Sequence, residues 1–155
     1  MVANKLLYRY PILLMLVMFI MGSFVESCSH YQSQSRILSE VERIVDEYPD
    51  SVLTILESID PSDLNADSLK AKYHYLKAYS HMKRNRSMIG DSLISFAHNY
   101  YRGKDIVKDI RSGTALAFYK FWIGDTPGSI AMLDSITRLP GVPDSLMVEA
   151  LRIRV

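Results

Sequence analysis

Apolar residues recur at helical spacing along the chain from residue 36 onward. In the first such segment the apolar side chains share one helical face and acidic residues occupy another; the apolar positions are Ile37, Leu38, Val41, Ile44, Val45 and Tyr48. Pro49 is expected to stop this helix, and Asp50 or Ser51 could cap a second one that ends at Pro61. Two helices joined this tightly form a hairpin.

Two further helix pairs are predicted after the first. The expected apolar faces of the second pair are Leu69, Tyr73, Leu76, Tyr79 and Met82, then Ile89, Leu93, Phe96, Ala97 and Tyr100. Those of the third pair are Ile106, Ile110, Gly113, Ala117 and Phe121, then Ile130, Leu133, Ile136 and Leu139. Polar turns at 83–86 and 124–127 split the pairs, and Asp144 or Ser145 could cap a last helix. No segment alternates with period two, so the prediction is an all-α fold of about seven helices without β-sheet.

The predicted turns repeat along the chain. Asn85 and Gly124 occupy equivalent turns thirty-nine residues apart, a period typical of stacked helical hairpins. The third pair resembles a tetratricopeptide repeat (TPR) in its Leu116-Ala117 pair, its turn at Gly124-Asp125 and its Pro140, although Gly113 stands where that family often has tryptophan. The segment 48–60 is similar to the opening repeat of TPR-bearing lipoproteins and sensor ectodomains of Bacteroidetes-type bacteria. A helical bundle without repeats is the alternative.

The N-terminal segment has the order of a secretory signal. Lys5 and Arg9 precede an uninterrupted apolar core over 11–25, and small residues follow. This core is fifteen residues long, whereas a membrane-spanning helix needs about 20. The segment 29–35 lacks aliphatic residues and is predicted to be a tether.

The end of this segment, Val25-Glu26-Ser27-Cys28, resembles the lipobox of bacterial lipoproteins, from which Glu26 departs. The resemblance covers only the export signal and implies a signal peptide over 1–27 and lipidation of Cys28. The rest of the chain divides into a polar tether over 28–35 and a helical domain over 36–155. The resemblance also implies export to the cell envelope, and Ser29 after the cysteine favours the outer membrane. An uncleaved signal anchor and an ordinary buried cysteine are the alternatives.

Charge and composition exclude several classes of function. The formal net charge of +1 creates no general field for nucleic acid, and the single cysteine allows neither an internal disulfide nor a Cys-based zinc site. His74 and His81 are seven residues apart, roughly 10 Å along a helix, too far to share a metal ion. We therefore expect no nucleic acid partner, no metal and no cofactor.

One tetrapeptide matches a catalytic motif. The segment 90–93, Gly-Asp-Ser-Leu, matches the nucleophile block of GDSL-type hydrolases. A serine nucleophile needs a neighbouring base, but no histidine here has the aspartate three residues before it that this family uses, and the block lies in a helical pattern. We predict no catalytic residues and no enzymatic activity.

Aromatic residues on the first helices are the candidate binding residues. In stacked hairpins these helices line the concave face, so Tyr75, Tyr79, Tyr119 and Trp122 are predicted to contact a protein or peptide partner of the envelope. Two groups of charges are interpreted as solvated: Glu40, Glu42, Asp46 and Glu47 on the first helix, and Lys83, Arg84 and Arg86 in a turn. The predicted function is a lipid-anchored interaction scaffold, with a sensor ectodomain as the alternative and a serine hydrolase as the least favoured hypothesis.

Overall fold

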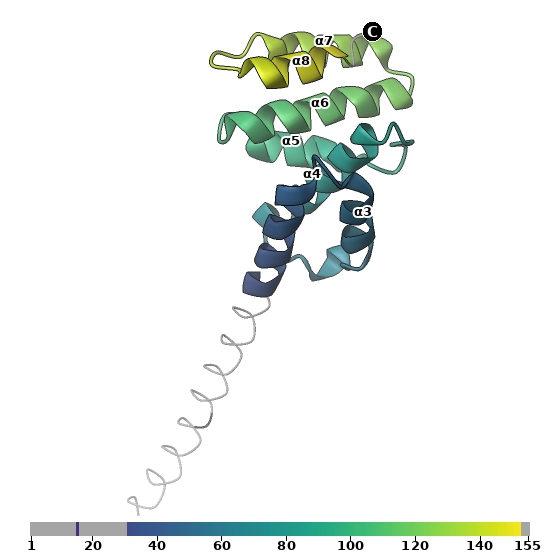
Figure 1. Ribbon diagram of the computed structural model, residues 1–155. Helices are drawn as coiled ribbons and strands as arrows, with labels where there is room; N and C mark the ends of the chain where they lie inside the picture. Colours follow the sequence, from purple (N-terminus) through teal and green to yellow (C-terminus); the bar gives the residue numbers. More distant parts are fainter. Residues whose placement is uncertain (1–14, 16–30, 153–155) are drawn as a thin grey trace, which may run out of the picture.

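All regular structure in the described part of the chain is helical. The computed structural model describes residue 15 and residues 31–152, and within them no strand occurs. Residues 31–44 are helical, and the later elements are α3 (Pro49–Glu57), the 3-10 helix η1 (Pro61–Asp63), α4 (Asp67–Lys83), α5 (Ile94–Tyr101), α6 (Ile106–Trp122), α7 (Thr126–Thr137) and α8 (Asp144–Arg152). Successive helices pack side by side in one stack, from the first hairpin to α7 and α8 (Figure 1). The predicted all-α stack is confirmed.

The predicted signal peptide and Cys28 lie outside the described residues. Among residues 31–152, no helix is long and apolar enough to cross a membrane. The predicted tether is wrong where it can be compared, because residues 31–35 are helical and Gln34 is buried. Gln34 precedes Leu38 by four residues, so both side chains lie on the buried face of this helix. Because Gln34 is polar, the pattern of aliphatic residues did not extend the predicted helix to this position.

The two predicted polar turns, at 83–86 and 124–127, are confirmed. Asn85 has a φ of +50° and Gly124 a φ of +84°, left-handed conformations that these residue types tolerate best. The expected cap of α3 at Asp50 or Ser51 is wrong, because Pro49 already occupies the first turn of α3 and the N-cap position is Tyr48. Proline suits this place, since its missing N–H would have no helical partner there.

The main hydrophobic cluster joins the first two hairpins to the middle of α6. Tyr75, Leu76 and Tyr79 of α4 lie at its centre, and Leu38, Val52 and Ile94 reach it from the neighbouring helices. Because α4 packs against α3, α5 and α6, it is covered on several sides.

The second helix of the second pair begins later than its pattern predicted. Ile89 and Leu93 are 67% and 52% exposed, and α5 starts only at Ile94. Met88 is fully buried in their place, and Asp91 is buried beside His81. The expected face through Ile89 and Leu93 is therefore wrong: residues 84–93 are not helical, and Asp91 contacts His81 where apolar periodicity alone suggested helix.

A second, smaller cluster holds α7 and α8 against α6. Its buried members among the described residues are Ala117, Leu133, Ile136 and Ala150. Gly113 allows the close approach of these helices: a Cβ there would lie 2.7 Å from Cγ2 of Ile136 and 3.1 Å from Cε1 of His98.

Candidate functional site

The predicted aromatic binding residues do not form an open surface. Tyr75 and Tyr79 are 1% and 0% exposed, so the expectation of open aromatic rings on a concave face is wrong for both. Their helix is the central one of the stack, which sequence periodicity did not reveal. Tyr119 and Trp122 are half-buried and pack against the main cluster. The Nε1 atom of Trp122 is buried without a hydrogen-bond partner in the described part of the chain.

Charged side chains instead connect the first helices of the stack. These are the helix over 31–44 with the turn after it, α4, α6 and α8, and we call their common side the first-helix face. The charged seam on this face consists of Glu42, Asp46, Lys72, Tyr79, Lys83, Asp105, Lys108, Arg111 and Glu149. Its ionisable side chains other than Tyr79 are 20% to 45% exposed, so each is partly dehydrated yet still reaches the surface.

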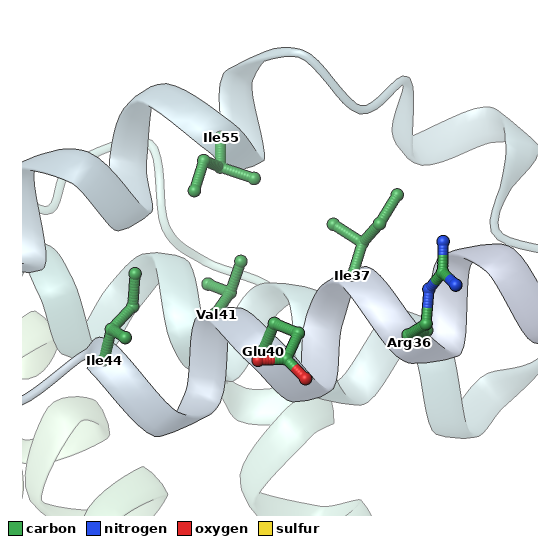
Figure 2. A pocket seen from close by; sticks show the side chains of 6 residues that line it. All are labelled: Arg36, Ile37, Glu40, Val41, Ile44 and Ile55. Atoms are coloured by element: carbon green, nitrogen blue, oxygen red, sulfur yellow. The ribbon is translucent and has the colours of Figure 1, made fainter.

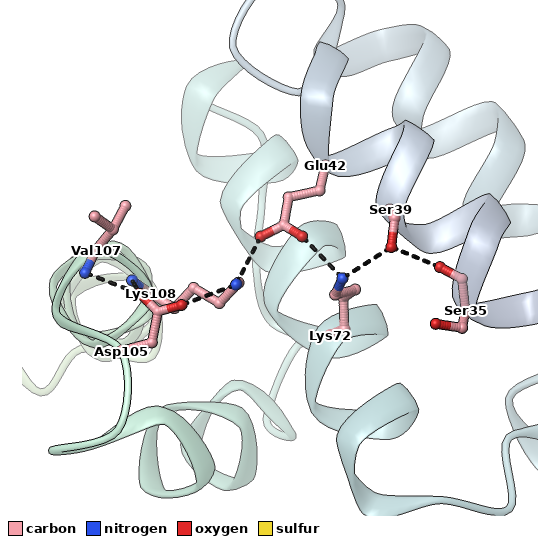
Figure 3. A network of polar contacts seen from close by, with 7 residues as sticks. All are labelled: Ser35, Ser39, Glu42, Lys72, Asp105, Val107 and Lys108. Atoms are coloured by element: carbon pink, nitrogen blue, oxygen red, sulfur yellow. Dashed lines mark hydrogen bonds and ion pairs between the residues drawn. The ribbon is translucent and has the colours of Figure 1, made fainter.

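Glu42 stands at the centre of one half of the charged seam (Figure 3). One of its carboxylate oxygens lies 2.9 Å from Nζ of Lys72 on α4, and the other lies 3.3 Å from Nζ of Lys108 on α6. Lys72 also donates to Oγ of Ser39, and Lys108 donates to Asp105. One carboxylate thus links three helices.

Asp46 repeats this arrangement one helical turn further on. Its Oδ2 accepts a hydrogen bond of 2.7 Å from Arg111 of α6, and its Oδ1 lies 3.4 Å from Nζ of Lys83 of α4. The Tyr79 hydroxyl lies 3.0 Å from the same Oδ1. The ring of Tyr79 has the Arg111 guanidinium 5.2 Å and the Lys83 ammonium 5.8 Å from its centroid, within the range of cation–π attraction.

The pKa shifts show which charges the seam stabilises. Burial alone would raise the pKa of Asp46, but Arg111, the Tyr79 hydroxyl and Lys83 together lower it below its usual value. Burial alone would lower the pKa of Lys108, but Asp105 and Glu42 outweigh it and raise the pKa. Burial, together with the hydrogen bond to Glu149, raises the pKa of Tyr79, so this phenol stays a proton donor at neutral pH.

The last helix joins the seam through one carboxylate. Oε1 of Glu149 accepts a hydrogen bond of 2.6 Å from the Tyr79 hydroxyl and lies 3.9 Å from Nζ of Lys83. An open hollow of about 450 Å³ lies beside this contact, lined by Lys83, Asp144, Ser145, Val148, Glu149 and Arg152. The contact brings together residues seventy positions apart in the sequence.

Two other hollows lie away from the seam. An apolar one of about 300 Å³ lies in the first hairpin, where Ile37, Val41 and Ile44 face Ile55 of α3 (Figure 2). One of about 250 Å³ lies between α5, α6 and α7, with His98 and Asp109 among its lining residues. Burial lowers the pKa of His98 even though Asp109 favours its charged form.

The residues of the hydrolase-like tetrapeptide are not arranged as a catalytic triad among the contacts of the described residues. Asp91 is buried and its Oδ2 lies 2.6 Å from Nδ1 of His81, whereas Ser92 is exposed in a turn before α5. This turn replaces the helical segment expected there. Among the described residues, no three His, Cys, Asp or Glu side chains are grouped so that they could hold a metal ion.

The interpretation of two charge groups as solvated is wrong for Glu42 and Lys83, whose side chains are partly buried in the charged seam. Asp46 is exposed as expected but pairs with Lys83 and Arg111, and Arg84 and Arg86 are about half exposed and pair with Asp50. A sequence signal was present: Glu42 and Asp46 are four residues apart on one side of a helix. Their partners are distant in the sequence, so the signal could not identify the pairs.

Searches with protein-family models, among curated proteins and among solved structures found no match for this chain. The resemblance to tetratricopeptide repeats and to a lipoprotein signal therefore stays a prediction from the sequence.

Proposed function

We propose that this chain is a protein-interaction scaffold, anchored by a lipid on Cys28 at the envelope of a bacterial cell, whose partner docks on the first-helix face. The charged seam is the observation that carries the docking site. It spans four helical segments and presents fixed charges that are only partly shielded from water.

The physical basis of this proposal is preorganisation. Lys72 and Lys108 are both held by Glu42, and Lys108 is held by Asp105 as well. A partner that meets side chains already fixed in place does not have to order them, so less conformational entropy is lost on binding. Charges of both signs in a set order also discriminate between partners more than they add affinity. Such a surface suits selective protein binding.

The docking site can be tested by in-cell cross-linking with matched variants. Lys108→Gln and Lys72→Gln each remove one seam charge, and Arg138→Gln removes one exposed charge at the end of α7. We expect cross-linking and mass spectrometry to recover a protein from the wild type and from the Arg138 variant, with strongly reduced recovery from both seam variants. Equal recovery from all of them, at equal protein levels, would contradict the proposed docking face.

The anchor has its own test. Cys28→Ser should abolish labelling with a radioactive fatty acid and leave an unprocessed precursor, because acylation requires the thiol. Ser29→Ala keeps the cysteine and is the matched control, so its labelling should persist. Labelling that survives in the Cys28 variant would refute the lipoprotein prediction. A mature protein that retains residues 1–27 and carries no lipid would indicate an uncleaved anchor instead.

A further inference from the structure

We propose that Glu149 of α8 occupies a carboxylate-binding site on the first-helix face, and that an acidic peptide segment of the partner displaces it. The helix α8 would then act as an internal substitute for the ligand. This inference rests on the proposed docking face and adds the chemistry of the partner and the way in which access is controlled.

The first argument is the proton balance at Tyr79. Its hydroxyl lies 3.0 Å from Asp46 and 2.6 Å from Glu149, but a phenol has a single proton to donate. Only one of these carboxylates receives that proton at a time. The shorter distance assigns the proton to Glu149, and when Glu149 leaves, the same hydroxyl can turn to Asp46. Release of α8 therefore leaves no buried donor unpaired.

The second argument is the unequal support of the two carboxylates. Asp46 has Arg111 at 2.7 Å and Lys83 at 3.4 Å, whereas the one cation paired with Glu149 in the described part of the chain is Lys83, at 3.9 Å. Glu149 is thus the carboxylate that is held less firmly. Its place between the Tyr79 hydroxyl and the Lys83 ammonium is the one that another carboxylate can take.

The third argument is the local charge. Lys83 of α4 and Arg111 of α6 lie beside Asp46, and Arg84 and Arg86, which follow α4, both pair with Asp50 at 2.9 Å. Without Glu149, the ion pairs of the described residues leave Lys83 and Arg111 sharing one carboxylate at this place, that of Asp46. The exposed site would be positively charged, so it would favour an acidic ligand.

The fourth argument is the limited apolar attachment of α8. Its buried side chains are Leu146 and Ala150, whereas Val148 and Leu151 are 49% and 41% exposed. The hollow of about 450 Å³ beside Glu149 leaves space for an incoming side chain. Displacement of α8 would expose little apolar surface, so its cost is small compared with unfolding any other helix of the stack.

The test uses hexaglutamate, labelled with an uncharged dye, and the full chain in a neutral detergent. Fluorescence anisotropy gives the dissociation constant, and amide hydrogen exchange of residues 146–152 reports the docking of α8. Glu149→Gln should bind the probe about tenfold more tightly than wild type and exchange faster in α8. Adding Lys83→Gln to Glu149→Gln should reverse that gain. Glu57→Gln removes an exposed carboxylate of α3 and should change the affinity less than about twofold.

Several results would overturn the proposal. Two concern affinity for the probe: the Glu149 and Glu57 variants bind it equally, or Lys83→Gln does not weaken its binding. The third is that hydrogen exchange in α8 does not become faster when the probe binds. The fourth is that hexathymidylate competes more strongly than unlabelled hexaglutamate. If one of these results occurs while the seam variants still reduce recovery of the cross-linked protein, the docking face is supported and its control by Glu149 is refuted. If hexaglutamate binds as expected but the seam variants do not change cross-linking, the carboxylate site is supported and the proposed scaffold function is refuted.

Discussion

The two ends of the stack are held together in different ways. The first two hairpins share one large cluster that includes Tyr75, Leu76 and Tyr79, and α4 runs through its centre. The C-terminal helices α7 and α8 rest on a cluster whose buried members in the described residues are Ala117, Leu133, Ile136 and Ala150. In the described part of the chain, the long-range hydrogen bond and ion pair of α8 both involve Glu149.

This difference indicates which part of the molecule can move at low cost. Burial of apolar surface is the main stabilising contribution in a folded domain, and the C-terminal helices share little of it. A helix held by two buried side chains and one carboxylate can detach while the rest of the stack stays folded. The comparison makes predictions about the size of each effect and about where in the chain it occurs.

The largest effect is expected at the centre of the main cluster. Leu76 is fully buried, so Leu76→Ala should reduce the free energy of unfolding by about 2–5 kcal/mol. Urea unfolding followed by circular dichroism measures it. Leu133→Ala makes the same chemical change in the small cluster and should mainly speed hydrogen exchange in α7 and α8. If Leu133→Ala lowers the main transition as much as Leu76→Ala does, the stack is one cooperative unit and the comparison fails.

The next effect lies at the end of α6, where Trp122 packs against the main cluster from its edge. Trp122→Ala should reduce the free energy of unfolding by about 3 kcal/mol, the lower end of the range for such truncations, because the ring is only half-buried. Trp122→Phe should cost about 1 kcal/mol or less, because the buried Nε1 that it removes has no partner among the described residues. Chemical denaturation provides both values. A loss under about 1 kcal/mol for Trp122→Ala would mark the ring as a surface residue.

Gly113→Ala should destabilise the contact between the two clusters by about 1–3 kcal/mol. Alanine favours a helix over glycine by about 1 kcal/mol, but its Cβ would lie 2.7 Å from Ile136. We expect the overpacking to outweigh the helix propensity and to appear as faster exchange in α7. A stabilised variant would mean that α7 shifts away freely, and the contact would then be looser than described.

Asp105→Ala removes the N-cap of α6 and should reduce the free energy of unfolding by about 1 kcal/mol. Its carboxylate accepts hydrogen bonds from the backbone N–H groups of Val107 and Lys108 and from Nζ of Lys108. Asp105→Asn retains a capping oxygen and loses only the charge, so thermal unfolding should place it between wild type and Asp105→Ala. Equal losses for both variants would assign the effect to the ion pair rather than to the cap.

The smallest effect is a pH dependence at Asp46. Its pKa in the folded chain lies below the usual value of an aspartate, so its charged form stabilises the fold above that usual value and the contribution is lost as the pH falls through the lowered pKa. Between about pH 5 and pH 3 the urea midpoint should decrease less in Asp46→Asn than in wild type. Identical pH profiles would show that Arg111 and Lys83 do not stabilise this carboxylate measurably.

The sequence predicted the helical fold well because local patterns determine it. Asn85 and Gly124 mark turns through their own backbone preferences, and the apolar face of the first helix needs only its neighbours along the chain. The start of α5 was wrong for a physical reason: the pair of Asp91 and His81 depends on two segments that meet only in the folded chain.

The candidate site was mostly unpredictable for the same reason. Tyr79 was predicted to be an exposed ring, whereas it is a buried phenol whose hydroxyl lies between two carboxylates. Amphipathic periodicity identifies which side of a helix is apolar; it does not tell how many neighbours cover the other sides. The link from Glu149 to Tyr79 joins positions so far apart in sequence that no local pattern reports it.

The paired cations on Glu42 and Asp46 also bear on how the chain tolerates insertions and deletions. Each carboxylate meets one cation from α4 and one from α6, and these contacts fix the rotation of both helices. One extra residue between Lys72 and Lys83 would rotate the remainder of α4 by about 100° and turn Lys83 away from Asp46. An extra residue in the turn before α5 would leave both pairs in place. Length variation in this protein should therefore gather in the turns and be absent from the helical segments that carry the seam.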